Sequence, residues 1–495
     1  MEQTNEVIAQ EPNRSGMSRR SFMGAMGVMG MMGAMGIMGG CAAQAPASEG
    51  GEEALGETGE PKGVAAGREN TNMWTPAEIE SIGGSIMPLY EINKRRRELI
   101  DSKGDYTKED GTVVPAVYTK LRALTNTYLV GCGSEVNDKC FDFFQMKFTE
   151  DEAQAYLEMP MGQWFNVRDY ALASGRPTEE CAEICEKLAK RGDLGRKRQS
   201  GVNYYHQLAL AHGFYEYGLL DYFKPGWTDN YRAAWSEDYA VGYMDSGTPF
   251  YYAIPVDKEV VSDDAILLTD DIEEIISRNS IFAVSPCQCR KIAMAINGDP
   301  EPPAIGTEEL KDFMAPCGHP LETCLSFGEV AEYYIENGSG REITADEVRA
   351  IIKRSVEAGM ILQSAFTKDQ YVICSCHGDC CRILGVYKTA GPEKCLSSSS
   401  FAQTSNYVLN YDTEGCIQCG QCMAHCPVGA IEPDADGYMM ANGLCMRCGQ
   451  CGTVCPAKVR TLSLKPEEEI LERPVDLVDE YNMIAGYRFE HGTIY

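Results

Sequence analysis

Eight cysteines near the C-terminus form a repeated pattern whose spacing suits metal chemistry. The first copy of the pattern consists of Cys416, Cys419, Cys422 and Cys426. Each has a counterpart 29 residues further along the chain: Cys445, Cys448, Cys451 and Cys455. A φ-locked proline follows the last cysteine of each copy. Thiolates three residues apart on a tight loop can close on three corners of one cubane, while the fourth cysteine is carried toward another cluster. The repeat therefore predicts two [4Fe-4S] clusters.

Over about residues 406–464 this repeat resembles the two-cluster bacterial ferredoxins. The resemblance implies one cluster on Cys416, Cys419, Cys422 and Cys455. It implies a second on Cys445, Cys448, Cys451 and Cys426. Zinc needs C-x2-C pairs separated by a longer spacer, and a disulfide framework does not require translational symmetry, so clusters are favoured over both alternatives.

A second concentration of cysteines lies upstream of the repeat. It comprises Cys287, Cys289, Cys317, Cys324, Cys374, Cys376, Cys380 and Cys381. Several of these follow predicted strands, as ligand loops require. Adjacent cysteines cannot easily both serve one cubane, so some of these thiols must do something else. We predict at least one further cluster, whose first ligands are Cys287, Cys289, Cys374 and Cys376. Disulfides are the main alternative for a protein that ends in an oxidising compartment.

The upstream arrangement is similar to the cysteine-rich region that precedes a ferredoxin-like tail in a group of bacterial and archaeal iron–sulfur proteins. The matching segments are 286–290 (PCQCR), 324–328 (CLSFG) and the cysteines after Tyr371. His319 and His377 lie beside cysteines and could ligate a metal, although a histidine bonded to backbone is the commoner outcome. No C-x2-C-H motif occurs, which excludes the usual covalent haem attachment.

Short elements are expected to position the upstream cysteines. Residues 281–284 predict a buried strand that ends just before Cys287. Thr344 begins a capping box for a helix that runs to about Ala358. A hairpin over residues 360–373 then delivers the cysteines from Cys374 onward.

Residues 149–204 predict three helices followed by a hairpin. The helices are expected from Thr149 to Leu157, over 166–174 and from Thr178 to Gly192, and the hairpin turns at residues 200–201. Three helices and a wing resemble a winged-helix module.

The third predicted helix places Cys181 and Cys185 on one apolar face, so these thiols are expected in the core. The module is locally basic, through Lys187, Lys190, Arg191, Arg196, Lys197 and Arg198. The more specific hypothesis for such a module is a DNA-binding regulator. An exported, acidic protein would not encounter DNA, however. We therefore expect a scaffold or docking surface.

Residues near the N-terminus predict that the protein is exported from the cytoplasm. Residues 18–23 (SRRSFM) precede an apolar stretch, and together they look like a twin-arginine export signal. Residues 38–41 (MGGC) resemble a lipoprotein processing site, with Met where Leu is preferred, which predicts lipidation of Cys41. An uncleaved helix that spans the membrane is the alternative, although recurrent glycine weakens both hydrophobicity and helix propensity. Iron–sulfur clusters are inserted in the cytoplasm, and the twin-arginine route carries proteins that are already folded. The predicted clusters and the predicted export signal therefore support each other.

Composition and pattern divide the chain into seven segments. A net charge of −29 disfavours nucleic acid as a partner. The segments are a signal (1–41), a disordered tether (42–70), a region of unknown fold (71–145), the winged-helix-like module (146–214), a cysteine-rich α/β domain (215–405), the ferredoxin domain (406–465) and a C-terminal tail (466–495). Cys132 and Cys140, in the third segment, are expected to be buried thiols or a disulfide.

These observations predict an α+β, multidomain lipoprotein on the outer face of the cytoplasmic membrane. It would transfer electrons through its clusters to or from a partner oxidoreductase. One alternative is a terminal reductase with a substrate site in residues 215–405, and another is a redox-sensing interaction protein. Reductive dehalogenases share the export signal and the two-cluster tail, but they require a corrinoid domain that no residue here specifies.

Overall fold

The computed structural model describes residues 87–128, 138–217, 222–224, 246–262, 266–402, 404–470 and 473–492. The predicted export signal around Arg19, the processing site at Cys41, the tether at 42–70 and Cys132 lie outside these residues. None of the helices in the described ranges is long and apolar enough to cross a lipid bilayer.

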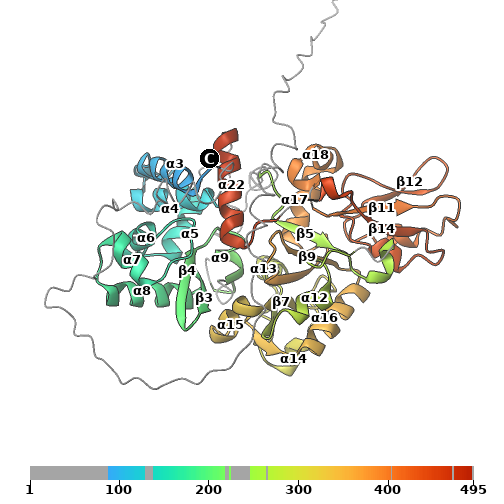
Figure 1. Ribbon diagram of the computed structural model, residues 1–495, viewed down its shortest axis with the longest axis horizontal. Helices are drawn as coiled ribbons and strands as arrows, with labels where there is room; N and C mark the ends of the chain where they lie inside the picture. The colour runs from blue at the N-terminus through green and yellow to red at the C-terminus, as the bar shows by residue number, and fades with distance from the viewer. Residues whose placement is uncertain are drawn as a thin grey trace, which may run out of the picture.

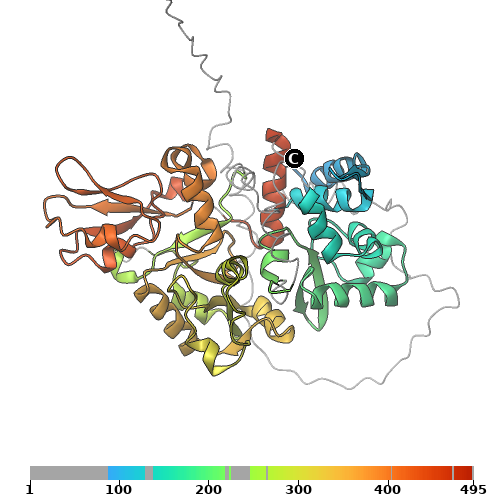
Figure 2. The same ribbon diagram turned by 180° about the vertical axis from the view of Figure 1, so that it is seen from behind.

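Helix and sheet are both abundant, and the chain forms three neighbouring parts (Figure 1). An N-terminal helical part and the C-terminal cysteine repeat lie at opposite ends, with the cysteine-rich region between them, and the view from behind shows the same order (Figure 2). The N-terminal part begins with α3 (Leu89–Asp101), β1 (Tyr106–Thr107), β2 (Val113–Val114), α4 (Ala116–Asn126) and α5 (Asp138–Lys147).

The three helices and the hairpin predicted next are all present. They are α6 (Glu150–Leu157), α7 (Val167–Ser174), α8 (Thr178–Lys190), β3 (Leu194–Gln199) and β4 (Val202–Gln207). Thr149 caps α6 through a capping box with Glu152, and the hairpin turns at Ser200 and Gly201, whose φ angles are 50° and 78°. Cys181 and Cys185 are fully buried, which confirms that they belong to the core.

The basic side chains of the hairpin are paired within the chain. Arg198 lies 2.7 Å from Glu332 and 2.9 Å from Glu336, and Arg196 also contacts Glu336. Both glutamates belong to α15 (Gly328–Glu336), which packs against β3. The hairpin therefore docks on the cysteine-rich region rather than presenting a free positive surface, while its assignment as a winged-helix module stays a prediction.

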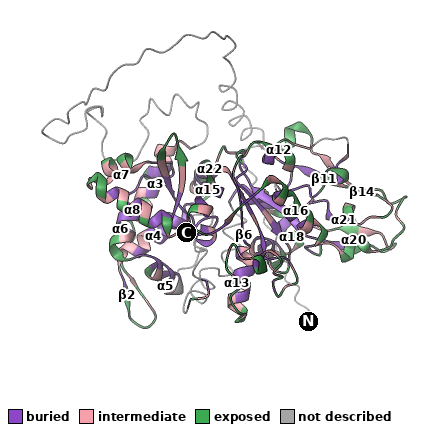
Figure 3. Cartoon of the chain, turned by 90° about the horizontal axis from the view of Figure 1, so that it is seen from below, coloured by how far each residue is buried: buried purple, intermediate pink, exposed green. Residues whose placement is uncertain are grey.

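A six-stranded sheet forms the centre of the cysteine-rich region. Its order is β5-β9-β10-β7-β6-β8, and every neighbouring pair is antiparallel. The strands are β5 (Tyr251–Ile254), β6 (Phe282–Pro286), β7 (Glu322–Phe327), β8 (Arg341–Ile343), β9 (Ile361–Ala365) and β10 (Val372–Cys376). The strands of this sheet are largely buried in the middle of the molecule, and Figure 3 shows this for β6.

Helices surround this sheet and connect its strands. They are α9 (Phe214–Tyr217), α12 (Ile272–Ser277), α13 (Gln288–Asn297), α14 (Glu308–Lys311), α16 (Ala345–Glu357), α17 (Arg382–Ala390), α18 (Pro392–Ser397) and α19 (Ser399–Ala402). The strand predicted at 281–284, the capping box at Thr344 and the hairpin that ends in Cys374 and Cys376 are all confirmed.

The C-terminal segment returns to the N-terminal helices as α22 (Leu477–His491). Tyr481 stacks on Tyr128 with ring centroids 5.2 Å apart. Arg488 donates to the carbonyl of Tyr128 at 2.7 Å, and Asn482 donates to that of Gly162 at 2.7 Å. The residues predicted as a tail therefore join the two ends of the described chain.

Candidate functional site

The two cysteine repeats fold in the same way, element by element. The short helices α20 (Gln421–Ala424) and α21 (Gln450–Thr453) occupy equivalent places, 29 residues apart. Before them, Gln418 and Arg447 both adopt a φ of 54°, although neither is glycine. The sequence repeat is thus a repeat of backbone conformation, as two equivalent ligand loops require.

The rest of the repeat domain is built from short strands. These are β11 (Tyr407–Tyr411), β12 (Ile431–Pro433), β13 (Met439–Ala441) and β14 (Arg460–Leu464), with η1 (Lys258–Val260) packed against α21 and η3 (Glu467–Glu469) following β14. Because β11 pairs with β14 and β12 pairs with β13, the first copy folds back on the second.

Four predicted ligands surround one small cavity in this domain. Cys416, Cys419, Cys422 and Cys455 all line it. The fourth cysteine of the second copy therefore lies with the first three of the first copy, as the ferredoxin resemblance implies. Cys419 is exposed, whereas Cys422 is buried, so this cavity lies close to the surface.

The other predicted set is more deeply placed. Cys448 and Cys451 are both buried. Burial raises the pKa of Cys448, and the neighbouring thiols of Cys451, Cys445 and Cys426 raise it further. This set combines Cys426 of the first copy with cysteines of the second.

Backbone amides donate to sulfur in both sets. The amide of Gln418 lies 3.3 Å from Cys416 Sγ, and the amide of Ala430 lies 3.2 Å from Cys426 Sγ. Amide donors stabilise negative charge on thiolate sulfur, so these residues fit the predicted clusters.

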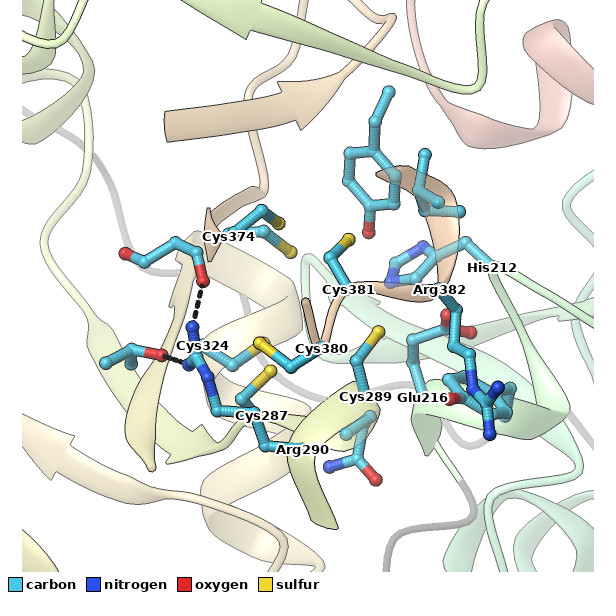
Figure 4. A pocket seen from close by; sticks show the side chains of 17 residues that line it. His212, Glu216, Cys287, Cys289, Arg290, Cys324, Cys374, Cys380, Cys381 and Arg382 are labelled. Atoms are coloured by element: carbon cyan, nitrogen blue, oxygen red, sulfur yellow. Dashed lines mark hydrogen bonds between the residues drawn. The ribbon is translucent and has the colours of Figure 1, made fainter. Parts of the chain in front are cut away.

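A second cavity, of about 50 Å³, lies in the cysteine-rich region (Figure 4). Seven cysteines line it: Cys287, Cys289, Cys324, Cys374, Cys376, Cys380 and Cys381. All four cysteines predicted as ligands of a further cluster are therefore brought together. Cys317 does not line this cavity, but its thiol is hydrogen-bonded to that of Cys380.

Three local structures deliver these thiols. Cys287 is the N-cap of α13, and Cys381 is the N-cap of α17. Cys374 and Cys376 are two residues apart on β10 and so face the same side of the sheet. The register of β10 with β7 pairs Val372 with Ser326 and Ile373 with Leu325, so one further step sets Cys374 opposite Cys324.

The thiols in the cavity lie close enough to one another to share hydrogen bonds. Hydrogen bonds from Cys324 and Cys376 hold the pKa of Cys374 well below its usual range, and those from Cys289 and Cys376 do the same for Cys381. The partner Cys376 has a raised pKa for the same reason. All cysteines in the described residues are free thiols, so the disulfide alternative is not what the structure shows.

Arg290 places a positive charge against these thiols. Its side chain is 1% exposed and donates to the carbonyls of Pro320 and Ser375, each at 2.9 Å, and to Thr323 Oγ1 at 2.8 Å. Its Nε is buried without a hydrogen-bond partner, and no carboxylate pairs with it among the described residues. Burial opposes its charge, whereas Cys287 and Cys380 raise its pKa. A buried guanidinium of this kind requires anionic neighbours, and thiolates are the available ones.

Polar groups other than thiols complete the cavity wall. His212, Glu216 and Tyr251 line it. Burial lowers the pKa of His212 to about 4, and its Nδ1 lies 3.1 Å from the hydroxyl of Tyr371. Burial raises the pKa of Glu216 well above its usual range, while its carboxylate accepts from the amide of Gly213 at 2.7 Å. His212 is therefore neutral near pH 7.

Both cysteine copies dock directly on the cysteine-rich region. Gln450, which lies between Cys448 and Cys451, donates to the carbonyl of Met360 at 2.7 Å and to that of Val356 at 3.1 Å. The amide of Gly378 donates to the carbonyl of Pro427 at 2.8 Å. The loop between Cys376 and Cys380 thus contacts the residue that follows Cys426.

Comparison with known proteins supports the assignment of the repeat. Residues 415–459 match the family model of a 4Fe-4S dicluster domain. No curated protein and no solved structure matches the chain. The C-terminal part is thus a 4Fe-4S dicluster domain, and the protein is an iron–sulfur protein with a role in electron transfer.

The sequence left four upstream cysteines without a role. Three of them, Cys324, Cys380 and Cys381, lie in the wall of the thiol-lined cavity. No local signal in the sequence indicated Cys324, because its place depends on how β7 pairs with its neighbours in the sheet. His319 and His377 do not line the cavity and instead approach Asp379.

Proposed function

We propose that this chain is an exported, membrane-anchored protein that transfers electrons between its dicluster domain and a further iron–sulfur centre in the thiol-lined cavity. When bound, [4Fe-4S] clusters take up and release single electrons. The observation that carries the proposal is the convergence of seven thiols on one cavity beside the dicluster domain.

The lining of the cavity suits a metal–thiolate centre better than an ordinary core. Most of it is sulfur, and the buried Arg290 supplies a positive charge that a net anionic centre would balance. Cys287, Cys289, Cys374 and Cys376 remain the first ligands to test. Cys324 and Cys381 are further candidates, since both lie in the same wall.

The contact between the two regions favours electron exchange within the chain. Cys448, Cys426 and Cys376 belong to one continuous core cluster of packed side chains. The hydrogen bond from Gly378 to Pro427 joins two loops that each follow a candidate ligand. Close packing excludes water and keeps the two sites at a fixed separation.

The exposed face of the first cysteine copy is where a redox partner would approach. Cys419 is exposed, and two apolar side chains beside it are unusually accessible: Ile417 at 65% and Met423 at 41%. Exposed apolar groups beside a redox site are typical of a docking surface for another protein. A partner oxidoreductase would therefore exchange electrons at this end.

Export and anchoring rest on the N-terminal signal. Replacing Arg19 and Arg20 by Lys is expected to retain the protein in the cytoplasm with its clusters intact. Replacing Cys41 by Ala is expected to block lipidation. Normal export of the double Lys variant would refute the twin-arginine assignment.

Reductive titration of the purified protein tests the electron-transfer proposal. The dicluster domain alone accepts about two electrons, one for each cluster. The intact chain is expected to accept more, and Cys376→Ala is expected to return the number to about two. Cys395→Ala is the control, because Cys395 is a buried thiol that does not line the cavity. Equal electron uptake by the unaltered protein, Cys376→Ala and Cys395→Ala would refute the further centre.

A terminal reductase is the second candidate, and one pocket favours it. This pocket, of about 150 Å³, is lined by Trp164, Lys197, Asp369 and Tyr371, among others. The hydroxyl of Tyr371 contacts His212, which lines the thiol-lined cavity. The side chains of Tyr371 and His212 would separate an organic substrate bound there from that cavity. Turnover with an artificial electron donor, lost on replacing Tyr371 by Phe, would favour this function.

A further inference from the structure

Two histidines and an aspartate come together beside the thiol-lined cavity. His319 Nε2 lies 3.2 Å from Asp379 Oδ2, and His377 Nδ1 lies 2.9 Å from Asp379 Oδ1. One ligand atom from each residue lies within 4.8 Å of the other two. His319 precedes β7, while His377 and Asp379 follow β10, so the sheet brings together segments 60 residues apart in sequence.

The geometry of the two imidazoles suits a shared cation. Their ring centroids are 4.3 Å apart and their planes are tilted by 38°. His377 Nδ1 is buried, and Asp379 Oδ1 lies 2.9 Å from it. Two ring nitrogens and one carboxylate therefore lie close enough together to share one ion.

The loop that carries two of the three residues is held by backbone contacts. The carbonyl of His377 accepts from the amides of Cys380 and Cys381, at 3.2 and 2.9 Å. Gly378 is bonded on both sides: its amide donates to Pro427, and its carbonyl accepts from Lys388 Nζ at 3.0 Å. A rigid loop preserves ligand geometry before a metal arrives, which lowers the entropic cost of binding.

We propose that His319, His377 and Asp379 bind one Zn²⁺ ion at a site separate from the thiol-lined cavity. Imidazole nitrogen and carboxylate oxygen are both common ligands of Zn²⁺. Three protein ligands leave coordination positions open, as catalytic sites do and closed structural sites do not. The side chains are 12%, 25% and 43% exposed in the order His319, His377 and Asp379, so water or a small anion can reach the metal.

The alternative is an ordinary ion pair, in which a proton rather than a metal lies between imidazole and carboxylate. An ion pair of this kind would bind no stoichiometric metal. It would also leave the zinc content unaffected when one of the three residues is replaced.

Zinc binding by the full-length, cluster-loaded protein tests the proposal. The protein is equilibrated with Zn²⁺ without oxygen, excess zinc is removed, and zinc, iron and sulfide are measured together. One zinc per chain is expected, with nitrogen and oxygen ligands at about 2.0–2.2 Å by zinc K-edge absorption. His319→Gln and Asp379→Asn are each expected to weaken zinc binding by roughly tenfold or more, with iron and sulfide unchanged.

His491→Gln is the matched control, because His491 is an exposed histidine on α22. It should bind zinc as the unaltered protein does. Zinc retained in full by His319→Gln and Asp379→Asn, or a zinc shell of sulfur at about 2.3 Å, would overturn the proposal. Unchanged spectra of the dicluster domain in both variants show that the protein is folded.

Discussion

The backbone carbonyl of Pro427 accepts a hydrogen bond of 2.8 Å from the amide of Gly378. Pro427 follows a predicted ligand of the second [4Fe-4S] cluster, and Gly378 lies between two cysteines of the thiol-lined cavity. This one bond joins two sites that the sequence separates by about 50 residues. It makes the dicluster domain an integral part of the molecule rather than an appended carrier.

Substituting Gly378 by Ala should loosen this contact. A Cβ at this position would lie 2.5 Å from the carbonyl oxygen of Pro427, which is backbone and cannot move aside cheaply. We expect a loss of about 1–3 kcal/mol in the free energy of unfolding, measured by urea denaturation without oxygen. Gly385→Ala is the control, since a Cβ there meets no atom within 4 Å. Equal free energies of unfolding for the two variants would show that this contact does not stabilise the protein.

Replacing Cys426 by Ala tests the exchange of ligands between the two copies. Cys426 belongs to the first copy in sequence, but it lies with Cys445 and Cys448 in space. The electron paramagnetic resonance spectrum of reduced Cys426→Ala should therefore resemble that of Cys448→Ala. A spectrum that matched Cys419→Ala instead would contradict the ferredoxin-like pairing.

Arg290 should set the potential of any centre in the thiol-lined cavity. Removing a positive charge makes an anionic centre harder to reduce. A unit charge roughly 5 Å away, at an effective dielectric constant of about 20, shifts the potential by on the order of 100 mV. Arg290→Gln should therefore lower that potential, as redox titration can measure. Arg290→Lys should keep most of the effect because it retains the charge. An unchanged potential in Arg290→Gln would show that the guanidinium does not influence the centre.

The parts of the fold with local signals were predictable from sequence. The capping boxes at Thr149 and Thr344 fix their helices through neighbouring residues, and the turn at Ser200 fixes the hairpin. The cysteine repeat was readable for the same reason, since its ligand loops are local.

Long-range relationships were not predictable in this way. Nothing near Cys324 in sequence indicates that it faces Cys374, because that neighbourhood depends on the register between β7 and β10. The return of α22 to the N-terminal helices likewise depends on contacts such as Tyr481 with Tyr128. Export and anchoring concern residues before 87 and stay predictions.

His206 should make stability depend on pH. Burial lowers its pKa from 6.5 to about 4, so the native state excludes a proton that the unfolded chain accepts. As the pH falls from 7 to 5 the unfolded state gains protons, and the native protein should lose about 2 kcal/mol of stability from this residue. The loss stops growing below about pH 4. The free energy of unfolding of His206→Gln, measured by denaturation, should fall less steeply as the pH is lowered. The same slope against pH in the variant and the unaltered protein would contradict the lowered pKa of His206.

Iron and acid-labile sulfide per chain test the central claim most directly. Two [4Fe-4S] clusters account for about eight irons, so a further centre in the thiol-lined cavity requires more than eight. We predict more than eight in the unaltered protein and a fall to about eight in Cys376→Ala, with the spectrum of the dicluster domain preserved. Eight irons in the unaltered protein, with no loss of iron in Cys376→Ala or Cys287→Ala, would contradict the account and leave the dicluster domain as the sole redox site.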